Sequence, residues 1–216
     1  MNITILDVEN TTTTKNNKLH LDPYERGNTL VMVGIHELGS ENTSTYIFDH
    51  NDTTRSDDIV SNHYAVQSCL DRTDILVCHN VAYDLIWLWE SGFKYTKGVY
   101  DTMLSQYVMN KGINNSLSLS HLAEYYKCSY LKQDVLKNYF SKGYSTKEIP
   151  RQELETYLIH DVLATKEIYE KQTKKLQNTT LLKTVQLTNE VCIALTKMYK
   201  AGFKIDTIAL ANVKQE

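Results

Sequence analysis

The hydrophobic pattern of this chain changes its period near residue 58, and this change limits the folds that the chain can form. Before that point, short apolar runs typical of strands occur at residues 3–6, 29–37 and 45–49, and Gly39 and Ser40 predict a hairpin between the last two. After it, helical spacing alternates with short buried runs. We therefore expect an α/β fold, with a mixed sheet whose antiparallel strands come first and whose faces are covered by helices.

The elements expected after residue 58 alternate between helix and strand. The first helix is expected to begin at Asp57 or Asp58, because a carboxylate suits an N-cap. The polar residues 11–26, before it, are expected to form a long irregular loop. Further strands are expected at 75–78 and 99–100, and further helices around Leu85 and at 103–109, 117–126, 131–140, 151–176 and 178–201.

Composition excludes several classes of protein. The chain has 216 residues, 42% of them hydrophobic, which suits one domain with a small appendage. A net charge of −3 is not the basic footprint of a protein that grips duplex DNA, although bound metal can neutralise an acidic site. The four cysteines form no C-x-x-C pair, so we expect free thiols in a reducing cytoplasm. No apolar run is long enough to span a membrane, and no membrane partner is expected.

Two carboxylates stand one residue apart at the expected end of the first strand. Alternate side chains of a strand share a face, so Asp7 and Glu9 point together while Val8 points to the opposite side. Two like charges this close require a cation, a proton or open water. On its own such a pair is most often a solvated strand end, so the rest of the chain has to decide its meaning.

Two further pairs are spaced to share a helix face. Asn80 and Asp84 are four residues apart after a buried strand, and Tyr157 and Asp161 are four apart in the long late helix. Hard divalent cations take oxygen ligands, and two of them can activate a water and stabilise the leaving oxygen during phosphodiester hydrolysis. A neutral tyrosine hydroxyl can position that water without adding charge. These residue types therefore indicate two-metal hydrolysis.

The order and spacing of these residues resemble the DEDD superfamily of 3′–5′ exonucleases, in its tyrosine-bearing branch. The first motif of that superfamily, D-x-E, matches residues 7–9, the second, N-x-x-[FY]-D, matches 80–84, and the third, Y-x-x-x-D, matches 157–161. YDTML, at 100–104, stands where such domains carry a similar stretch. The chain most resembles the proofreading domain of family A DNA polymerases over residues 1–176, which implies a ribonuclease-H-like mixed sheet.

The resemblance implies two divalent cations, Mg²⁺ or Mn²⁺, and a set of ligands for them. Asp7, Glu9 and Asp161 would hold the cation that activates water. Asp7 would also bridge to the second cation, which Asp84 would hold directly or through water. The same four carboxylates are thus both the expected metal ligands and expected catalytic residues.

The resemblance also implies contacts with the substrate. Tyr157 would orient the nucleophile, Glu9 would contact the 3′-terminal nucleotide, and Asn80 would help to position the strand near the scissile phosphate. Two departures leave roles unassigned: His160 occupies a position where an acidic or small residue is common, and residues 11–14 replace the usual apolar wedge.

The end of the chain carries a second resemblance. Residues 189–210 resemble the junction that opens the polymerase half of family A enzymes. We therefore expect an exonuclease domain at 1–176 and a helical tail at 177–216. The chain is interpreted as a piece of a longer polymerase or as a separate exonuclease subunit, with a phage source and the host cytoplasm as its location. The expected partners are a single-stranded DNA 3′ end and a polymerase half.

Three alternatives stay open. An exoribonuclease of the ribonuclease D type shares the same motifs, and only RNA would offer it a 2′-hydroxyl. A fold kept as a non-catalytic DNA-binding module of a polymerase would bind 3′ ends without turnover. Zinc, held by His79 and His160 with neighbouring acids, is the least favoured, because the two histidines are not expected to converge.

Overall fold

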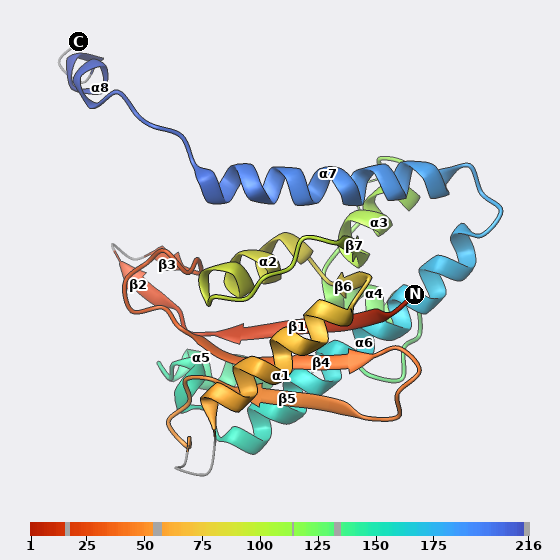
Figure 1. Cartoon of the computed structure of the whole chain (residues 1–216), viewed down its shortest axis with the longest axis horizontal. Coiled ribbons are helices and arrows are strands. Elements are labelled where there is room, and N and C mark those ends of the chain that lie inside the picture. The colour runs from red at the N-terminus through yellow and green to blue at the C-terminus, as the bar shows by residue number, and fades with distance from the viewer. Residues whose placement is uncertain (16–17, 54–57, 114, 132–134, 214–216) are drawn as a thin grey trace.

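The computed structural model describes residues 1–15, 18–53, 58–113, 115–131 and 135–213 (Figure 1). Its strands are β1 (Ile3–Asn10), β2 (Thr13–Lys15), β3 (Lys18–His20), β4 (Leu30–Glu37), β5 (Thr43–Ile47), β6 (Ile75–Cys78) and β7 (Gly98–Asp101). Its α-helices are α1 (Ile59–Arg72), α2 (Val81–Glu90), α3 (Thr102–Met109), α4 (Leu119–Tyr125), α5 (Val135–Ser141), α6 (Arg151–Leu176), α7 (Leu181–Ala201) and α8 (Thr207–Val213), with a 3₁₀ turn at Thr146–Glu148.

The main sheet has five strands in the order β5-β4-β1-β6-β7, and β2 pairs with β3 in a small separate sheet. β1 pairs antiparallel with β4 and parallel with β6, while β4–β5 is antiparallel and β6–β7 is parallel. The predicted mixed sheet, antiparallel first and parallel later, is therefore confirmed. Each parallel connection passes through a helix, as the geometry of parallel strands requires.

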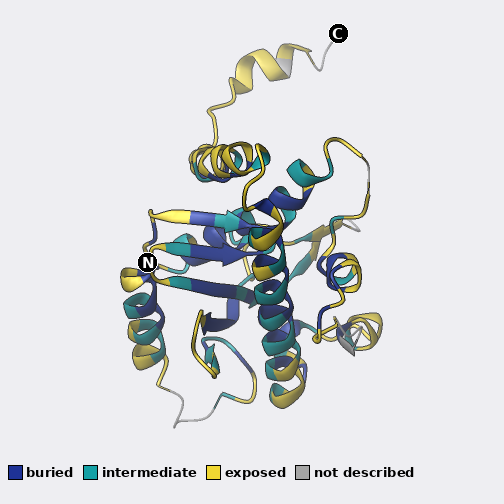
Figure 2. Cartoon of the chain, turned by 90° about the vertical axis from the view of Figure 1, so that its right-hand side faces the viewer, coloured by how far each residue is buried: buried dark blue, intermediate teal, exposed yellow. Residues whose placement is uncertain are grey.

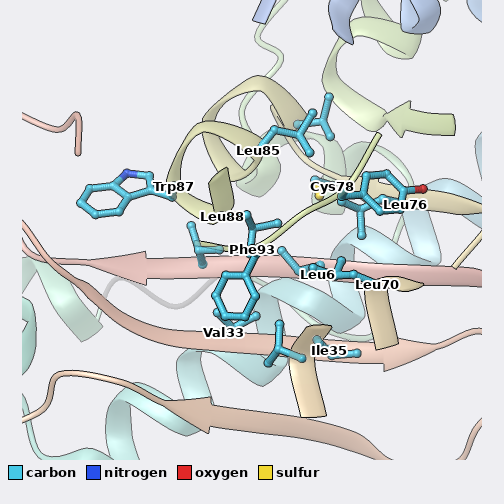
Figure 3. Packing of buried hydrophobic residues seen from close by; sticks show 14 of the residues in the cluster. Leu6, Val33, Ile35, Leu70, Leu76, Cys78, Leu85, Trp87, Leu88 and Phe93 are labelled. Carbon is cyan, nitrogen blue, oxygen red and sulfur yellow. The ribbon is translucent and has the colours of Figure 1, made fainter. Parts of the chain in front are cut away.

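The two faces of the sheet bury different helices, and β1 alternates between them. Leu6 and Val8 pack with α1 and α2, whereas Ile5 packs with α6. Figure 2 shows the buried strands with helices on both sides, and Figure 3 shows Leu88 of α2 and Phe93 in one cluster with Leu6 and Val33 of the sheet. Because side chains alternate along a strand, Asp7 and Glu9 share the Ile5 face and point toward the side that α6 covers.

Helix α6 crosses the sheet at Gly34 of β4, which is the register partner of Asp7. A Cβ atom at Gly34 would lie 2.8 Å from Cγ of Leu158 and 2.9 Å from Cγ2 of Val162. Only a glycine allows the backbone of the helix this close to the strand. Since Leu158 and Val162 each follow directly after a residue of the third motif, this contact brings that motif next to β1.

The first strand is longer than expected. β1 continues to Asn10 because β4 goes on pairing with it, with Glu9 opposite Met32. Asp7 and Glu9 therefore lie in the second half of the strand, with Glu9 next to its last residue, Asn10, and the predicted place of the pair at the strand end is confirmed. The prediction that they share a face opposite to Val8 is confirmed, since Val8 belongs to the core on the other side.

Residues 11–15 and 18–26 are more ordered than their polar sequence indicates. They contain β2 and β3, and the carbonyl of Leu21 accepts hydrogen bonds from Nε1 of Trp87 at 3.2 Å and from the hydroxyl of Tyr83 at 3.3 Å. The hydroxyl of Tyr83 also donates to Oδ1 of Asn10 at 2.6 Å. The expectation of an irregular loop is wrong here because side chains of α2, distant in sequence, bind its backbone.

The helix boundaries agree closely with the pattern. Asp58 caps α1, accepting hydrogen bonds from the N–H groups of Val60 and Ser61, while Asp57 lies outside the described residues. α6 has the predicted bounds, and α7 ends at Gly202, whose φ of 63° only glycine adopts without strain. Part of the helix predicted at 131–140 lies outside the described residues, and α5 begins at Val135.

Helix α7 packs along α2, α3 and β7, and α8 stands away from the body of the protein (Figure 1). Several apolar residues of α7 are exposed, as the sequence predicts: Leu187, Val191, Leu195 and Met198. A cavity of about 780 Å³ lies between α2, α7 and residues 19–23.

None of the helices in the described ranges is long and apolar enough to cross a membrane. All four cysteines are free and buried.

Candidate active site

A second pocket, of about 260 Å³, opens between β1 and α6. It is lined by four of the predicted site residues: Asp7, Glu9, Tyr157 and Asp161. His79, Leu119 and Phe140 also line it. The first and third motifs, about 150 residues apart in the sequence, therefore meet in one place. Three of these residues are carboxylates, so the pocket is a strongly acidic site.

The third motif lies on the buried side of α6. Asp161 is only 3% exposed, and the Tyr157 hydroxyl is hydrogen-bonded to its carboxylate. Burial raises the pKa of Tyr157 far above its usual value, and the nearby charges of Asp161 and Glu9 raise it further. Tyr157 is therefore a neutral phenol at any ordinary pH. It can orient a water molecule by hydrogen bonding and it adds no fifth negative charge to the site.

The second motif reaches the site because β6 is short. β6 pairs with β1 only from Ile3 to Ile5, so beyond Ile5 the edge of β1 that faces β6 is open. The first turn of α2 packs against β1 here, and Asp84 lies close enough to Asp7 for their charges to repel each other. A carboxylate from the opposite layer of the fold thus comes to lie beside Asp7.

Asp84 is in an unfavourable environment for a charge. It is 1% exposed, and its Oδ1 atom has no hydrogen-bond partner among the described residues. Burial raises the pKa of Asp84 well above its usual value, and repulsion from Asp7 and Asp101 raises it further. A buried carboxylate arranged in this way is stabilised by a bound cation, which supplies both a charge and a ligand position.

Replacing Asp84 by asparagine is expected to stabilise the metal-free protein by about 1 kcal/mol at pH 7.5, a rise in Tm of about 2–4 °C. The pKa of Asp84 in the folded protein is above the unfolded value of about 3.9. The free-energy cost of ionising Asp84 in the folded protein is therefore absent below that pH and grows as the pH rises above it. Thermal unfolding in EDTA at pH 4 and 7.5 would show a gain only at the higher pH. A loss of stability at pH 7.5, measured beside the exposed control Asp71→Asn, would contradict this view.

The residues present fit hard divalent cations by their chemistry. All the predicted ligands are carboxylate oxygens, the type that Mg²⁺ and Mn²⁺ prefer. Within the described ranges no group of three His, Cys, Asp or Glu side chains forms a ready-made metal cluster. Asp7, Glu9 and Asp161 line the pocket, and Asp84, which is not among its lining residues, has a buried Oδ1 atom without a hydrogen-bond partner in the described chain. The roles of individual ligands remain predictions.

Asn80 is not placed as the sequence indicates. It adopts the left-handed conformation, with φ 75° and ψ 58°, at the N-cap of α2. Its side chain therefore does not share a helix face with Asp84, and this prediction is wrong. Asn80 is exposed and lines the 780 Å³ cavity, whereas the acidic pocket is lined by other residues. Its predicted contact with nucleic acid is untested.

Asp101 is a residue whose importance the sequence analysis missed. Its carboxylate accepts hydrogen bonds from the backbone N–H groups of Asn80 and Val81, at the start of α2, and from those of Met103 and Leu104, at the start of α3. An aspartate between a buried strand and a helix is a typical N-cap, and that signal is present in YDTML. That the same carboxylate also caps α2 is visible only in the structure.

The two histidines of the zinc alternative lie in different surroundings. Nδ1 of His79 is 2.8 Å from the hydroxyl of Thr102, and His79 lines the acidic pocket. The ring of His160 lies 5.6 Å from that of Tyr130, on a different side of α6 from Asp161. Only one of the two therefore faces the carboxylates.

A family described as 3′–5′ exonuclease matches residues 21–177, nearly three quarters of the chain. The chain belongs to this family of 3′–5′ exonucleases. The match begins after the first motif, so the placement of Asp7 and Glu9 beside the other two motifs comes from the structure. None of the curated proteins matches the chain.

Solved structures share the fold. NrnC of Brucella melitensis, determined with bound Mg²⁺, has a TM-score of 0.63 at 15% identity, covering 93% of this chain and 86% of NrnC. NrnC bound to pGG has a TM-score of 0.64 at 16% identity, with 93% and 85% covered. The catalytic core of RRP6 from Trypanosoma brucei has a TM-score of 0.59 at 18% identity, covering 88% of this chain and 45% of that protein. The predicted ribonuclease-H-like exonuclease fold is thereby confirmed.

Proposed function

We propose that this protein removes nucleotides one at a time from the 3′ ends of single-stranded DNA, releasing 5′-monophosphates with the help of two divalent cations. The observation that carries the proposal is the meeting of the first and third motifs at one acidic pocket, with Asp84 of the second motif beside Asp7. The DNA preference is supported by the YDTML stretch and by the polymerase-like residues 189–210.

The reaction follows from the site. Asp7, Glu9, Asp84 and Asp161 would hold the cations, and bound Mg²⁺ or Mn²⁺ would lower the pKa of a water molecule and stabilise the leaving oxygen. Tyr157, which stays neutral, would orient that water toward the phosphorus of the terminal phosphodiester. The water would lose one proton to solvent as its oxygen bonds to phosphorus, the bond from phosphorus to the 3′ oxygen of the penultimate nucleotide would break, and that oxygen would take up a proton from solvent.

The second candidate is an exoribonuclease. The solved structure of NrnC bound to pGG, which shares this fold, is the observation that favours it. At 16% identity the likeness shows the fold alone, so it does not choose between DNA and RNA. The two sugars differ only by the 2′-hydroxyl, and a test must therefore vary that group.

The deciding experiment compares 5′-labelled single-stranded DNA and RNA of one sequence in Mg²⁺, Mn²⁺ or EDTA. A third substrate is the same DNA with a single ribonucleotide at its 3′ end. We expect a descending ladder on DNA that disappears in EDTA. A faster ladder on RNA and on the DNA with a 3′ ribonucleotide would establish the exoribonuclease. A folded protein that binds 3′ ends but forms no ladder on any substrate would favour the non-catalytic module.

We further propose that residues 177–216 connect the exonuclease domain to a polymerase half, within one chain or between two. The support is the resemblance of residues 189–210 together with the exposed apolar side chains of α7 and α8, such as Met198 and Ile208. Apolar surface of this kind marks an interaction site. Co-purification of the chain with a DNA polymerase from the source organism, lost on deletion of 203–216, would test it.

A further inference from the structure

Helix α7 carries a polar residue in the middle of the side that it buries. Its buried side chains are Val185, Asn189, Cys192 and Thr196, spaced to form one stripe. Asn189 is 4% exposed, and a buried amide is costly unless its hydrogen bonds are made. Packing alone does not require an asparagine here, so the partners of its amide group explain its presence.

Those partners lie on β7, on α3 and on α7 itself. Oδ1 of Asn189 accepts a hydrogen bond of 2.6 Å from the backbone N–H of Asp101, and Nδ2 donates to the carbonyl of Val185 at 2.8 Å and to Oγ of Ser105 at 3.3 Å. β7 is at the edge of the sheet, with β6 as its only strand neighbour in the described chain. The N–H of Asp101 therefore needs an acceptor from outside the sheet, and α7 supplies it.

The carboxylate of Asp101 is in turn hydrogen-bonded to the start of α2. Its Oδ1 accepts from the N–H of Asn80 at 3.1 Å and its Oδ2 from that of Val81 at 2.9 Å. These two bonds fix the left-handed turn at Asn80 and the first turn of α2. Asp84 is in that first turn, which has no side-chain cap of its own from Asn80.

We propose that Asn189 is a positioning residue for the exonuclease site: through Asp101 and the start of α2, the docking of α7 sets where Asp84 stands beside Asp7. The inference rests on the proposed function, since Asp84 is the expected cation ligand. Asn189 itself is outside the acidic pocket and contacts none of its carboxylates in any described hydrogen bond. Its effect is therefore on the geometry of the second motif.

The way in which α7 packs makes the hydrogen bond between Asn189 and Asp101 the main connection from α7 to the start of α2. α7 packs against α3, β7 and α2, and several of its residues between Thr188 and Tyr199, Cys192 and Thr196 included, border the 780 Å³ cavity. The hydrogen bond to Asp101 lies on the side of the helix that packs against β7. Loss of this hydrogen bond would loosen Asp101 and the start of α2 together. Mutation of a residue that supports a metal ligand typically lowers metal affinity by about 10–100-fold.

The test replaces Asn189 by leucine, which keeps the size of the side chain and removes its acceptor. Thr196→Val is the matched control, because Thr196 is equally buried on α7 and its hydroxyl bonds only to the carbonyl of Cys192 in the same helix, at 2.7 Å. Mn²⁺ binding is followed by the electron paramagnetic resonance signal of the free ion, without substrate. The KM and kcat for a single-stranded oligonucleotide are measured separately.

We expect Asn189→Leu to bind Mn²⁺ about 10-fold more weakly and to lower kcat at fixed Mg²⁺, with KM changed less than about 2-fold. Thr196→Val should match the unaltered protein in Mn²⁺ affinity. Equal Mn²⁺ affinity in folded Asn189→Leu, or equal weakening in Thr196→Val, would overturn the inference. Asn189→Ala serves in its place if the leucine variant does not fold. If no oligonucleotide is cut by the unaltered protein, the proposed function fails, while the Mn²⁺ titration still decides the role of Asn189.

Discussion

Replacing Asp7 by alanine is expected to lower kcat on a 3′ end by on the order of 10³-fold, with the fold intact. Asp7 lies on the pocket side of β1, and its charge reaches both Asp84 and Tyr157. Its loss would therefore remove a ligand from each of the two expected cations. Single-turnover hydrolysis of a labelled oligonucleotide in saturating Mg²⁺ measures the effect.

The same substitution is not expected to unfold the protein. Asp7 repels the buried carboxylate of Asp84, so its removal relieves an unfavourable interaction. Asp7→Asn keeps the shape without the charge and should be nearly as inactive, while the exposed Asp71→Ala should keep full activity. If Asp7→Asn retained more than a tenth of the activity, Asp7 would not be a cation ligand.

The second large effect is expected at Gly34, a residue that touches no substrate. Alanine there would place a methyl group 2.8 Å from Leu158 and 2.9 Å from Val162, so α6 must move away from β4. Overpacking of this kind costs about 2 kcal/mol, a fall in Tm of about 4–8 °C. Because the third motif lies on α6, a displacement of this helix by about 1 Å is expected to lower kcat by about 10²-fold.

Two variants separate this mechanism from general destabilisation. Leu158→Ala makes room for the added methyl group, so the double variant with Gly34→Ala should be more active than Gly34→Ala alone, which a double-mutant cycle measures. Gly98→Ala is the matched control, because its methyl group would meet the carbonyl of Asp74 at 3.2 Å, far from α6. Full activity in Gly34→Ala would show that α6 and its motif reach the site in another way.

Several features of the site were predictable because they depend on local geometry. The period of a strand places Asp7 and Glu9 on one face and Val8 on the other, whatever surrounds them. The four-residue spacing of Tyr157 and Asp161 places both on the pocket side of α6, whose bounds the hydrophobic pattern also gave. The cap at Asp58 follows in the same way from a single turn of helix.

Other features depend on contacts that no local pattern contains. The left-handed turn at Asn80 is imposed by Asp101, and the position of Leu21 by hydrogen bonds from Trp87 and Tyr83. The length of β1 depends on where its neighbour β4 continues to pair. In each case the deciding partner is distant in the sequence, which is why the local prediction was wrong.

The sequence by itself determined which chemical groups the site contains and which of them share a strand or helix face, because these depend on residue type and on backbone periods. Only the tertiary structure decided how they meet. The short β6 opens the edge of β1 to Asp84, and Gly34 lets α6 approach β1. Asp101 fixes α2 against α7. The distances between the site residues are set by close packing and by buried hydrogen bonds between segments that are remote in the sequence. These interactions act only once the chain has folded.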